Sequence, residues 1–296
     1  MTQPSRFGAQ SMVAPLCRVI VKRPAEAFRS AAAIGAQWRV LGYTAPPDLA
    51  AAGEEHARLV GILEASGAEV LSLPADDRTG LDSLYTHDPG IVTAAGAILF
   101  QTGKAARRGE APAMADALRG WQVPILGSVD GQATAEGGDT LWIDARTLAV
   151  GRSYRTNAAG IAALRELVRP LGVEVIELHL PHWSGPAEVL HLQSFISMLD
   201  DRLAVVYRKL LPVPLHEILD ARGFTLIDIA EEEFPTQACN VLALAPRRAV
   251  ILRGNPVTRD RLRKAGCELV ELDGAEISFK GMGGPTCLTR PVWRQN

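Results

Sequence analysis

The sequence predicts an α/β fold in which a strand–strand–helix–strand unit occurs five times and closes into a ring. Two observations predict it. The same order of elements occurs four times between residues 91 and 271, and the segments left over at the two ends supply the parts of a fifth unit. Because no Pro/Gly/Ser-rich or charged linker interrupts the middle of the chain, we expect one domain over residues 1–296.

The first complete unit starts with a predicted hairpin at residues 91–100, where apolar runs flank a turn at residues 94–96. A helix is expected at residues 112–118 and a strand at residues 123–126. The other three units follow the same order. Their elements are predicted at residues 140–143, 148–150, 158–168 and 173–176; at 195–199, 203–207, 215–221 and 225–229; and at 241–244, 249–252, 258–264 and 268–271.

The last strands of these units recur at similar spacing. Taken at Leu126, Ile176, Ile227 and Val270, they are 50, 51 and 43 residues apart, which is typical of radially repeated folds. The fifth unit combines a C-terminal strand at residues 275–279 with an N-terminal strand, helix and strand at residues 19–22, 53–65 and 69–73. Pairing of the last strand with the first would leave no free sheet edge. An ordinary α/β sheet with antiparallel hairpins is the alternative.

The composition excludes several classes of protein. With 31 basic and 33 acidic side chains, the net charge of −2 supplies no field for nucleic acid or an anionic membrane. The longest apolar runs are far shorter than the roughly 20 residues of a spanning helix, and residues 1–10 carry no apolar signal segment. We therefore expect a soluble, cytoplasmic protein, for which a homodimer would be ordinary.

Side chains that could react fall at one recurring place, just before or at the start of the first strand of each unit. They are Asp88, Glu136, His191 and the pair Cys239 and Asn240. Cys287 follows the predicted last strand through a glycine-rich loop at residues 281–285, which would let the backbone approach a ligand closely. Equivalent positions in a ring of five units converge on its axis, so we expect these side chains to form one site.

Each of these residues also has a purely structural interpretation. Asp88 before Pro89 is a common turn initiator, and Glu136 precedes glycines that could form a tight turn. His191 could be a hydrogen-bonded core histidine, and Cys287 could be a buried, inert thiol. Their equivalent placement favours the common site.

A cysteine, a histidine and two carboxylates suit attack on a cationic sp² carbon. Carboxylates hold a guanidinium by paired, charge-assisted hydrogen bonds, and unit charges about 4 Å apart attract by about 4 kcal/mol at an effective dielectric near 20. The bound cation would favour the thiolate of Cys287. His191 would protonate the leaving amine and then activate water. This chemistry needs no cofactor.

Five motifs in order resemble those of the guanidine-modifying superfamily of arginine deiminases, amidinotransferases and dimethylarginine dimethylaminohydrolases. They are the Asp88 segment, Glu-Gly-Gly-Asp at residues 136–139, Arg-Thr-Asn at residues 155–157 with Gly160, Leu-His-Leu at residues 190–192 with Ser194, and Thr286 with Cys287. The resemblance runs from about Leu71 to Cys287. It implies a five-bladed α/β propeller, the pentein fold, and a small guanidino compound as substrate.

Within this superfamily the chain is most similar to the dimethylarginine dimethylaminohydrolases. Leu-Pro-Ala-Asp at residues 73–76, Asp82 six residues before Asp88, and Arg-Arg-Gly-Glu at residues 107–110 carry the similarity. It implies the following roles: Cys287 as nucleophile, His191 as general acid and base, Asp88 on the guanidinium, Glu136 supporting it and orienting His191, Asp82 on the substrate, and Arg107 and Arg155 on its carboxylate. The implied product is a ureido compound such as citrulline, formed through an S-alkylthiouronium intermediate.

Two positions depart from the family pattern. His87 stands where this branch commonly has an acidic residue, so we expect it to influence which guanidino substrate binds. Gln193 stands where deiminases and amidinotransferases have an aspartate, which disfavours deimination of free arginine. An amidinotransferase or an arginine deiminase that acts on another guanidino compound is the alternative.

Two further classes of function fit the sequence less well. A metal-dependent hydrolase could use His179, His182 and His191, but Pro181 prevents the first two from sharing a helical face, and no cysteine pair has zinc-ligand spacing. A non-catalytic binding protein would resemble a ribosome-associated initiation factor of the same fold, but the cysteine and histidine positions are filled here. Residues 38–47, which mix aromatic and turn residues, are the candidate lid.

Overall fold

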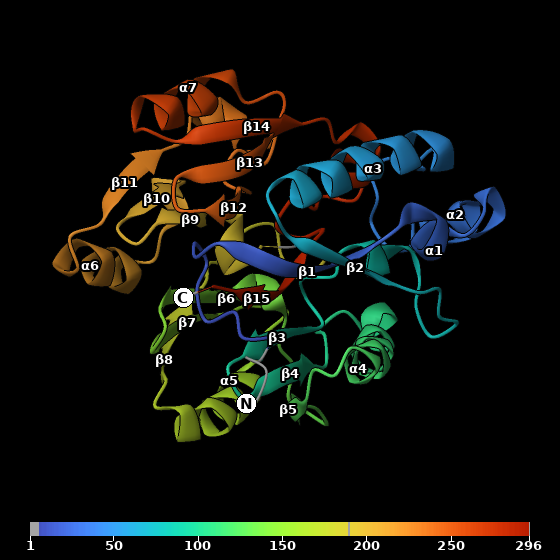
Figure 1. The fold of residues 1–296 in the computed structure, drawn as a ribbon, viewed down its shortest axis with the longest axis horizontal. Coiled ribbons are helices and arrows are strands. Elements are labelled where there is room, and N and C mark those ends of the chain that lie inside the picture. The colour runs from blue at the N-terminus through green and yellow to red at the C-terminus, as the bar shows by residue number, and fades with distance from the viewer. Residues whose placement is uncertain (1–5, 189, 296) are drawn as a thin grey trace.

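The computed structural model describes residues 6–188 and 190–295. Within these ranges, fifteen strands form five three-stranded sheets. In every sheet, the middle strand pairs antiparallel with one neighbour and parallel with the other. Figure 1 shows the sheets around the middle of the molecule, with the long helices on the outside. No helix in the described ranges has both the length and the apolar character needed to cross a membrane.

Four sheets have the predicted order of strand, strand, helix and strand. They are β3 (Gly90–Thr93), β4 (Gly96–Phe100), α4 (Glu110–Gly120) and β5 (Ile125–Val129); β6 (Thr140–Asp144), β7 (Thr147–Arg152), α5 (Ala158–Val168) and β8 (Glu174–His179); β9 (Ile196–Asp200), β10 (Leu203–Val206), α6 (Val213–Ala221) and β11 (Thr225–Asp228); and β12 (Leu242–Ala245), β13 (Arg248–Leu252), α7 (Pro256–Lys264) and β14 (Glu268–Leu272). The predicted order of these four units is therefore confirmed, with shifts of a few residues at element ends.

The fifth sheet joins the two ends of the chain. Its strands are β15 (Arg290–Arg294), β1 (Leu16–Lys22) and β2 (Glu69–Leu73), and α1 (Pro24–Phe28), α2 (Ala31–Gln37) and α3 (Leu49–Ala65) lie between β1 and β2 in the sequence. β15 pairs antiparallel with β1. The predicted pairing of a last strand with the first is thus confirmed.

The prediction that residues 275–279 form this last strand is wrong. Ala275–Phe279 forms one π-helical turn, not a strand, although its alternating apolar residues have the period of a strand. The carboxylate of Glu55 in α3 accepts hydrogen bonds from the backbone N–H groups of Glu276 and Ile277 at 2.9 and 3.1 Å, which stabilises the start of the turn. The true strand begins at Arg290 and contains two arginines and a proline, which hide it in the sequence.

The hydrophobic core consists of five clusters, each of which joins two neighbouring sheets. One packs Ile98 of β4 and Val150 of β7 with Ile161 of α5. Another packs Val19 of β1 and Val250 of β13 with α3. The remaining clusters join the other neighbouring sheets in the same way, so the sheets follow one another in a cycle.

Candidate active site

Five residues hold the same place in the five sheets, just before the first strand of each unit. Asp88 precedes β3, Glu136 precedes β6, His191 precedes β9 and Asn240 precedes β12. Because the last strand is β15, Cys287 precedes the first strand of the fifth unit. The corrected strand therefore completes the equivalence that the sequence indicated for the other positions.

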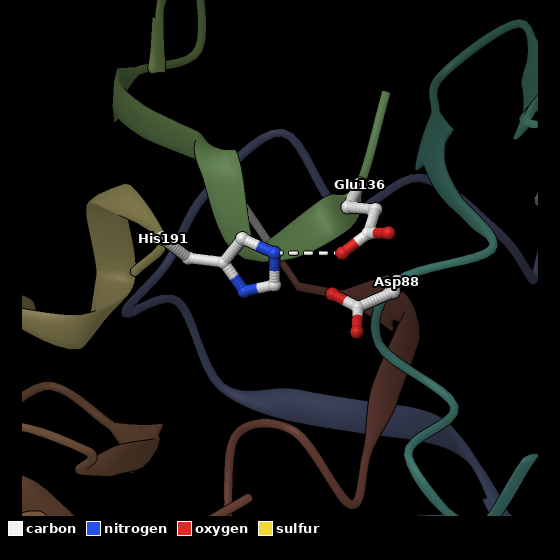
Figure 2. Close-up of side chains that lie close together, drawn as sticks. All are labelled: Asp88, Glu136 and His191. Carbon is white, nitrogen blue, oxygen red and sulfur yellow. Dashed lines mark hydrogen bonds and ion pairs between the residues drawn. The ribbon is translucent and has the colours of Figure 1, made fainter. Parts of the chain in front are cut away.

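Three of these side chains meet in one place. Oxygens of Asp88 and Glu136 and a ring nitrogen of His191 all lie within 4.8 Å of one another, and the three residues are buried. Figure 2 shows the imidazole beside both carboxylates, with each residue coming from a different part of the chain. His191 Nε2 lies 2.8 Å from Glu136 Oε2. The structure therefore brings together three of the predicted site residues.

Glu136 is held by the Arg-Thr-Asn motif. Its backbone N–H donates to Thr156 Oγ1 at 3.1 Å, and Arg155 Nη1 lies 3.6 Å from Glu136 Oε1. Asn157 caps α5 by accepting a hydrogen bond from the backbone N–H of Gly160 at 2.8 Å. One short motif therefore starts a helix and fixes the carboxylate that contacts His191.

The Glu-Gly-Gly-Asp segment allows close contacts that a larger residue would block. A Cβ at Gly138 would collide with the His191 ring. The backbone N–H of Gly138 donates to Asp88 Oδ1 at 3.0 Å. Asp139 is buried and accepts from the backbone N–H of Leu192, also at 3.0 Å. The segment thus positions His191 from two sides and binds one oxygen of Asp88.

His191 carries a proton at neutral pH. Burial alone would lower the pKa of its imidazole, but the carboxylates of Asp139, Asp88 and Glu136 outweigh burial and raise that pKa to about 9. The backbone is fixed by Ser194, whose Oγ accepts from His191 N and whose N–H donates to His191 O, both at 3.0 Å. A protonated, positioned imidazole is suited to act first as an acid.

The carboxylate of Asp88 already has a guanidinium partner within the protein. Arg107 Nη1 lies 2.5 Å from Asp88 Oδ2, and Arg107 also donates to both oxygens of Glu110. Burial opposes ionisation of Asp88, but Arg107 and nearby histidines hold the pKa of this carboxyl well below its usual range. Burial raises the pKa of Glu110 to about 7 despite Arg107. Arg107 therefore lies where the guanidinium of the substrate is expected.

The side chain of Cys287 is half-buried, and its thiol is hydrogen-bonded to Asn240. Asn240 Nδ2 donates to Cys287 Sγ at 3.2 Å, and Asn240 Oδ1 accepts from the backbone N–H of Thr286 at 3.0 Å. Burial and the carboxylate of Asp88 raise the pKa of the thiol to about 11, although Asn240 and Arg107 act in the opposite direction. The resting side chain is therefore a thiol.

The glycines before Cys287 contact protein, whereas the sequence suggested a ligand. A side chain at Gly281 or Gly283 would collide with Tyr85, and one at Gly284 would collide with Asn240. These glycines allow the loop to pack closely on the residues around the thiol.

Asp82 is linked to the candidate lid through Lys104. Lys104 Nζ lies 2.6 Å from Asp82 Oδ2 and 2.6 Å from the carbonyl oxygen of Leu41, which belongs to residues 38–47. The backbone N–H of Lys104 donates to Glu136 Oε1 at 3.3 Å. One lysine thus connects the candidate lid with two predicted site residues.

His87 and Gln193, the two residues that depart from the family pattern, are hydrogen-bonded to each other. His87 Nε2 lies 3.0 Å from Gln193 Nε2, and His87 Nδ1 lies 2.9 Å from the carbonyl oxygen of Thr289. Because a carbonyl only accepts, Nδ1 carries the proton and Nε2 accepts from the amide. Burial and Arg290 lower the pKa of His87 to about 3, so the ring is neutral. Both ring nitrogens have protein partners, and the predicted effect of His87 on substrate choice stays a prediction.

The histidines of the metal-site alternative do not come together. His179 and His182 line a groove of about 390 Å³ beside Arg155. In the parts of the chain that the structure describes, the only group with metal-ligand geometry is the trio of Figure 2, which includes neither of them.

Four residues at the site are assigned no role from the sequence. They are Lys104, Glu110, Asp139 and Asn240. Glu110 had a usable signal, because it lies three residues after Arg107 and carries the opposite charge. Asn240 had its equivalent position. Lys104 had none, since its partners are distant in the sequence.

Comparison with known proteins agrees with the motifs. The family model for N,N dimethylarginine dimethylhydrolase, eukaryotic, matches residues 39–294. The chain is 26% identical over 243 residues to the N(G),N(G)-dimethylarginine dimethylaminohydrolase of Pseudomonas aeruginosa, covering 82% of this chain and 89% of that one. It is 29% identical over 244 residues to the uncharacterised protein YkgA of Bacillus subtilis, covering 82% and 80%.

Solved structures share the fold. The Pseudomonas aeruginosa enzyme complexed with citrulline has a TM-score of 0.76 at 23% identity and covers 93% of this chain and 99% of its own. The amidinotransferase SxtG of Microseira wollei has a TM-score of 0.79 at 16% identity, covering 99% and 98%. At these identities the likeness concerns the fold, so the chemistry is argued from the residues.

Proposed function

The chain belongs to the dimethylarginine dimethylaminohydrolase family, and from this premise we propose that it is a cysteine hydrolase acting on an arginine derivative. Related proteins act on guanidino compounds as hydrolases or transferases. The proposed substrate is a methylated arginine or a similar guanidino compound, and the products are an amine and a ureido compound such as citrulline. The observation that carries the proposal is the buried trio of Asp88, Glu136 and protonated His191, together with the thiol of Cys287, on which the charge of Asp88 acts.

Two carboxylates hold the substrate cation. Asp88 and Glu136 lie close enough together to bind two adjacent edges of one planar guanidinium. Bringing this cation next to Cys287 lowers the pKa of the thiol, because a positive charge favours the thiolate. The substrate therefore helps to ionise a nucleophile that is a thiol at rest.

The reaction then proceeds in two halves. The thiolate of Cys287 forms an S–C bond to the guanidine carbon, and the C–N bond to the leaving amine breaks as His191 gives that nitrogen a proton. His191, now neutral, takes a proton from water, whose oxygen attacks the thiouronium carbon. The S–C bond breaks, and the hydroxyl proton of the tetrahedral adduct passes to the sulfur, replacing the thiol proton that left to solvent when the substrate bound. The ureido product leaves, with Cys287 again a thiol and His191 again protonated.

Arg107 must change partners for this substrate to bind. It lies 2.5 Å from Asp88, the carboxylate proposed to receive the guanidinium of the substrate. We infer that the substrate displaces this side chain, which then binds the substrate carboxylate together with Arg155. Asp82 contacts the substrate from the side of the candidate lid.

The arrangement of the sheets supports a specific architecture. We propose that the five sheets, which hydrophobic clusters join in cyclic order, are the blades of one five-bladed α/β propeller that forms a single domain over residues 1–296. The site would lie at its axis.

A substrate panel tests the function. Purified protein is assayed with arginine, methylated arginines and shorter guanidino acids for release of ammonia or amine and for the ureido product. Cys287→Ala should lower turnover by roughly 10³-fold or more. Cys267→Ala, which removes a thiol that packs in a hydrophobic cluster with Leu262, should retain the turnover.

The outcomes separate the alternatives. Ureido product from methylated arginines supports the hydrolase, product from arginine alone indicates a deiminase, and transfer to an added amine indicates an amidinotransferase. No turnover on any substrate, with Cys287 no more easily alkylated than Cys267, would contradict the proposal.

A further inference from the structure

A small internal cavity lies apart from the groove beside Arg155. Its volume is about 20 Å³, which is room for one particle of roughly the size of a water molecule. Its lining includes His87, Gln193, Ser197, Thr286, Arg290 and Arg294. We call it the Arg294 cavity.

Two buried arginines of this cavity differ from the others. Five arginines are buried in the described residues, and Arg18, Arg107 and Arg155 each have a carboxylate oxygen within 3.6 Å. Arg290 and Arg294 have no carboxylate within 4.0 Å in the described ranges.

The hydrogen bonds of these two arginines go to backbone carbonyls. Arg290 donates to the carbonyl oxygen of His87, and Arg294 donates to those of Ala14 and Ala243 at 2.6 and 2.8 Å. Carbonyl dipoles satisfy N–H groups but carry no net charge. Asp88 attracts Arg290 only from beyond ion-pair distance. Among the described residues, these two positive charges therefore lack an ion-pair partner.

Two polar atoms of the cavity lining also lack partners. Arg294 Nε and Thr286 Oγ1 are buried, and neither has a hydrogen-bond partner among the described residues. Such atoms are rare in native structures and often mark a bound water or ion. Both can donate a hydrogen bond. The cavity lining therefore combines excess positive charge with unused donors.

We propose that the Arg294 cavity binds one monatomic anion, chloride under physiological conditions. A buried charge without a partner is strongly unfavourable, and an anion among guanidinium and hydroxyl donors removes that penalty. Room for one water-sized particle suits a monatomic ion better than phosphate, sulfate or a carboxylate compound. The neutral ring of His87 adds no charge that would alter this balance. The proposal does not depend on the reaction at Cys287.

Bromide locates the site directly. Crystals of the wild-type protein grown without chloride are soaked in sodium bromide, and anomalous diffraction is recorded at the bromine edge. We expect a peak in the cavity within hydrogen-bond distance of Arg294 Nε. Since this experiment uses the unaltered chain, it does not rely on any variant folding.

A solution measurement tests whether the site is occupied at ordinary salt. The Tm is measured in sodium chloride and in sodium gluconate at equal ionic strength. A tenfold increase in chloride above its Kd should raise the Tm by about 2–4 °C, and gluconate should not. Arg294→Met should abolish the difference between the salts, whereas Arg169→Met, on the surface, should retain it.

Three results would overturn the proposal. Density for water without an anomalous peak would show that the cavity is simply hydrated. A bromide peak without a chloride-specific change in Tm would show binding at soak concentration only. A chloride effect that survives in Arg294→Met would place the ion elsewhere.

Discussion

The buried trio of Asp88, Glu136 and His191 and the Arg294 cavity neutralise buried charge in different ways. Around His191, three acids have a cationic partner: Asp82 with Lys104, Asp88 with Arg107, and Glu136 with His191. Around the cavity, Arg290 and Arg294 contact only carbonyl groups in the described structure. A paired carboxylate can exchange one cation for another and so accept a substrate. A cation without an acid instead favours a permanently bound anion.

The largest expected effect comes from removing Arg107, the cation beside Asp88 and Glu110. Arg107→Met leaves Asp88 and Glu110 buried without their partner, and we expect a loss of roughly 3–5 kcal/mol in the free energy of unfolding at pH 7. The ion pair with Arg107 depresses the pKa of Asp88. The pair therefore contributes to the free energy of unfolding at pH values above 3.8, the ordinary pKa, and this contribution is lost as the pH falls further. Urea unfolding at pH 7 and pH 3 should show the penalty shrinking in acid.

Arg294→Met is the matched control for this prediction. It removes a cation of similar burial but leaves no carboxylate unpaired. In low chloride, this variant should therefore lose clearly less free energy of unfolding than Arg107→Met. Equal losses for the two variants would mean that charge pairing does not distinguish the two regions.

A smaller effect is expected from the proton on His191. Its pKa rises from 6.5 to about 9 on folding, so its contribution is complete below pH 6.5 and is lost as the pH rises through about 9. The shift corresponds to about 3 kcal/mol. Unfolding free energies of the wild type and His191→Gln are compared at pH 6 and pH 10. A constant difference between the two proteins across this range would show that the acids do not hold the proton.

The next effect concerns the thiol, on which the two neighbours act in opposite directions. Asp88→Asn should lower the pKa of Cys287 below about 11, and Asn240→Ala should raise it, each by roughly one unit or tenfold in thiolate at a given pH. The rate of alkylation against pH, measured in a Cys267→Ala background, reports this value. Shifts of the same sign in both variants would contradict the assigned contacts.

The sequence predicted the repeat where strands are apolar and failed where buried polar residues build the strand. The strands of the four complete units, such as β4, are runs of apolar residues between turn signals. β15 contains Arg290, Pro291 and Arg294, whose burial depends on carbonyl groups far away in the chain. No local pattern encodes such contacts, so the sequence pattern favours a strand at the alternating residues 275–279 instead.

The same limit applies to the site. The repeat predicted that Asp88, Glu136 and His191 would meet, because equivalent positions in a cyclic fold converge. It could not predict the cations beside Asp82 and Asp88, since Lys104 reaches Asp82 across 22 residues and Arg107 reaches Asp88 across 19. Position in the repeat determines where the backbone of a residue lies, whereas ion pairing depends on where the charged group of its side chain lies.

The smallest effect tests whether the two departures from the family pattern act together. His87 and Gln193 form a buried hydrogen bond between the trio and the Arg294 cavity, since His87 adjoins Asp88 in the chain and both residues line the cavity. A double-mutant cycle with His87→Ala and Gln193→Ala should give a coupling free energy of about 1 kcal/mol by urea unfolding. The pair His87→Ala and Arg169→Ala should be additive. Additivity of the first pair would mean that the two substitutions are independent, and then the neutral ring of His87 would owe its orientation to Thr289 alone.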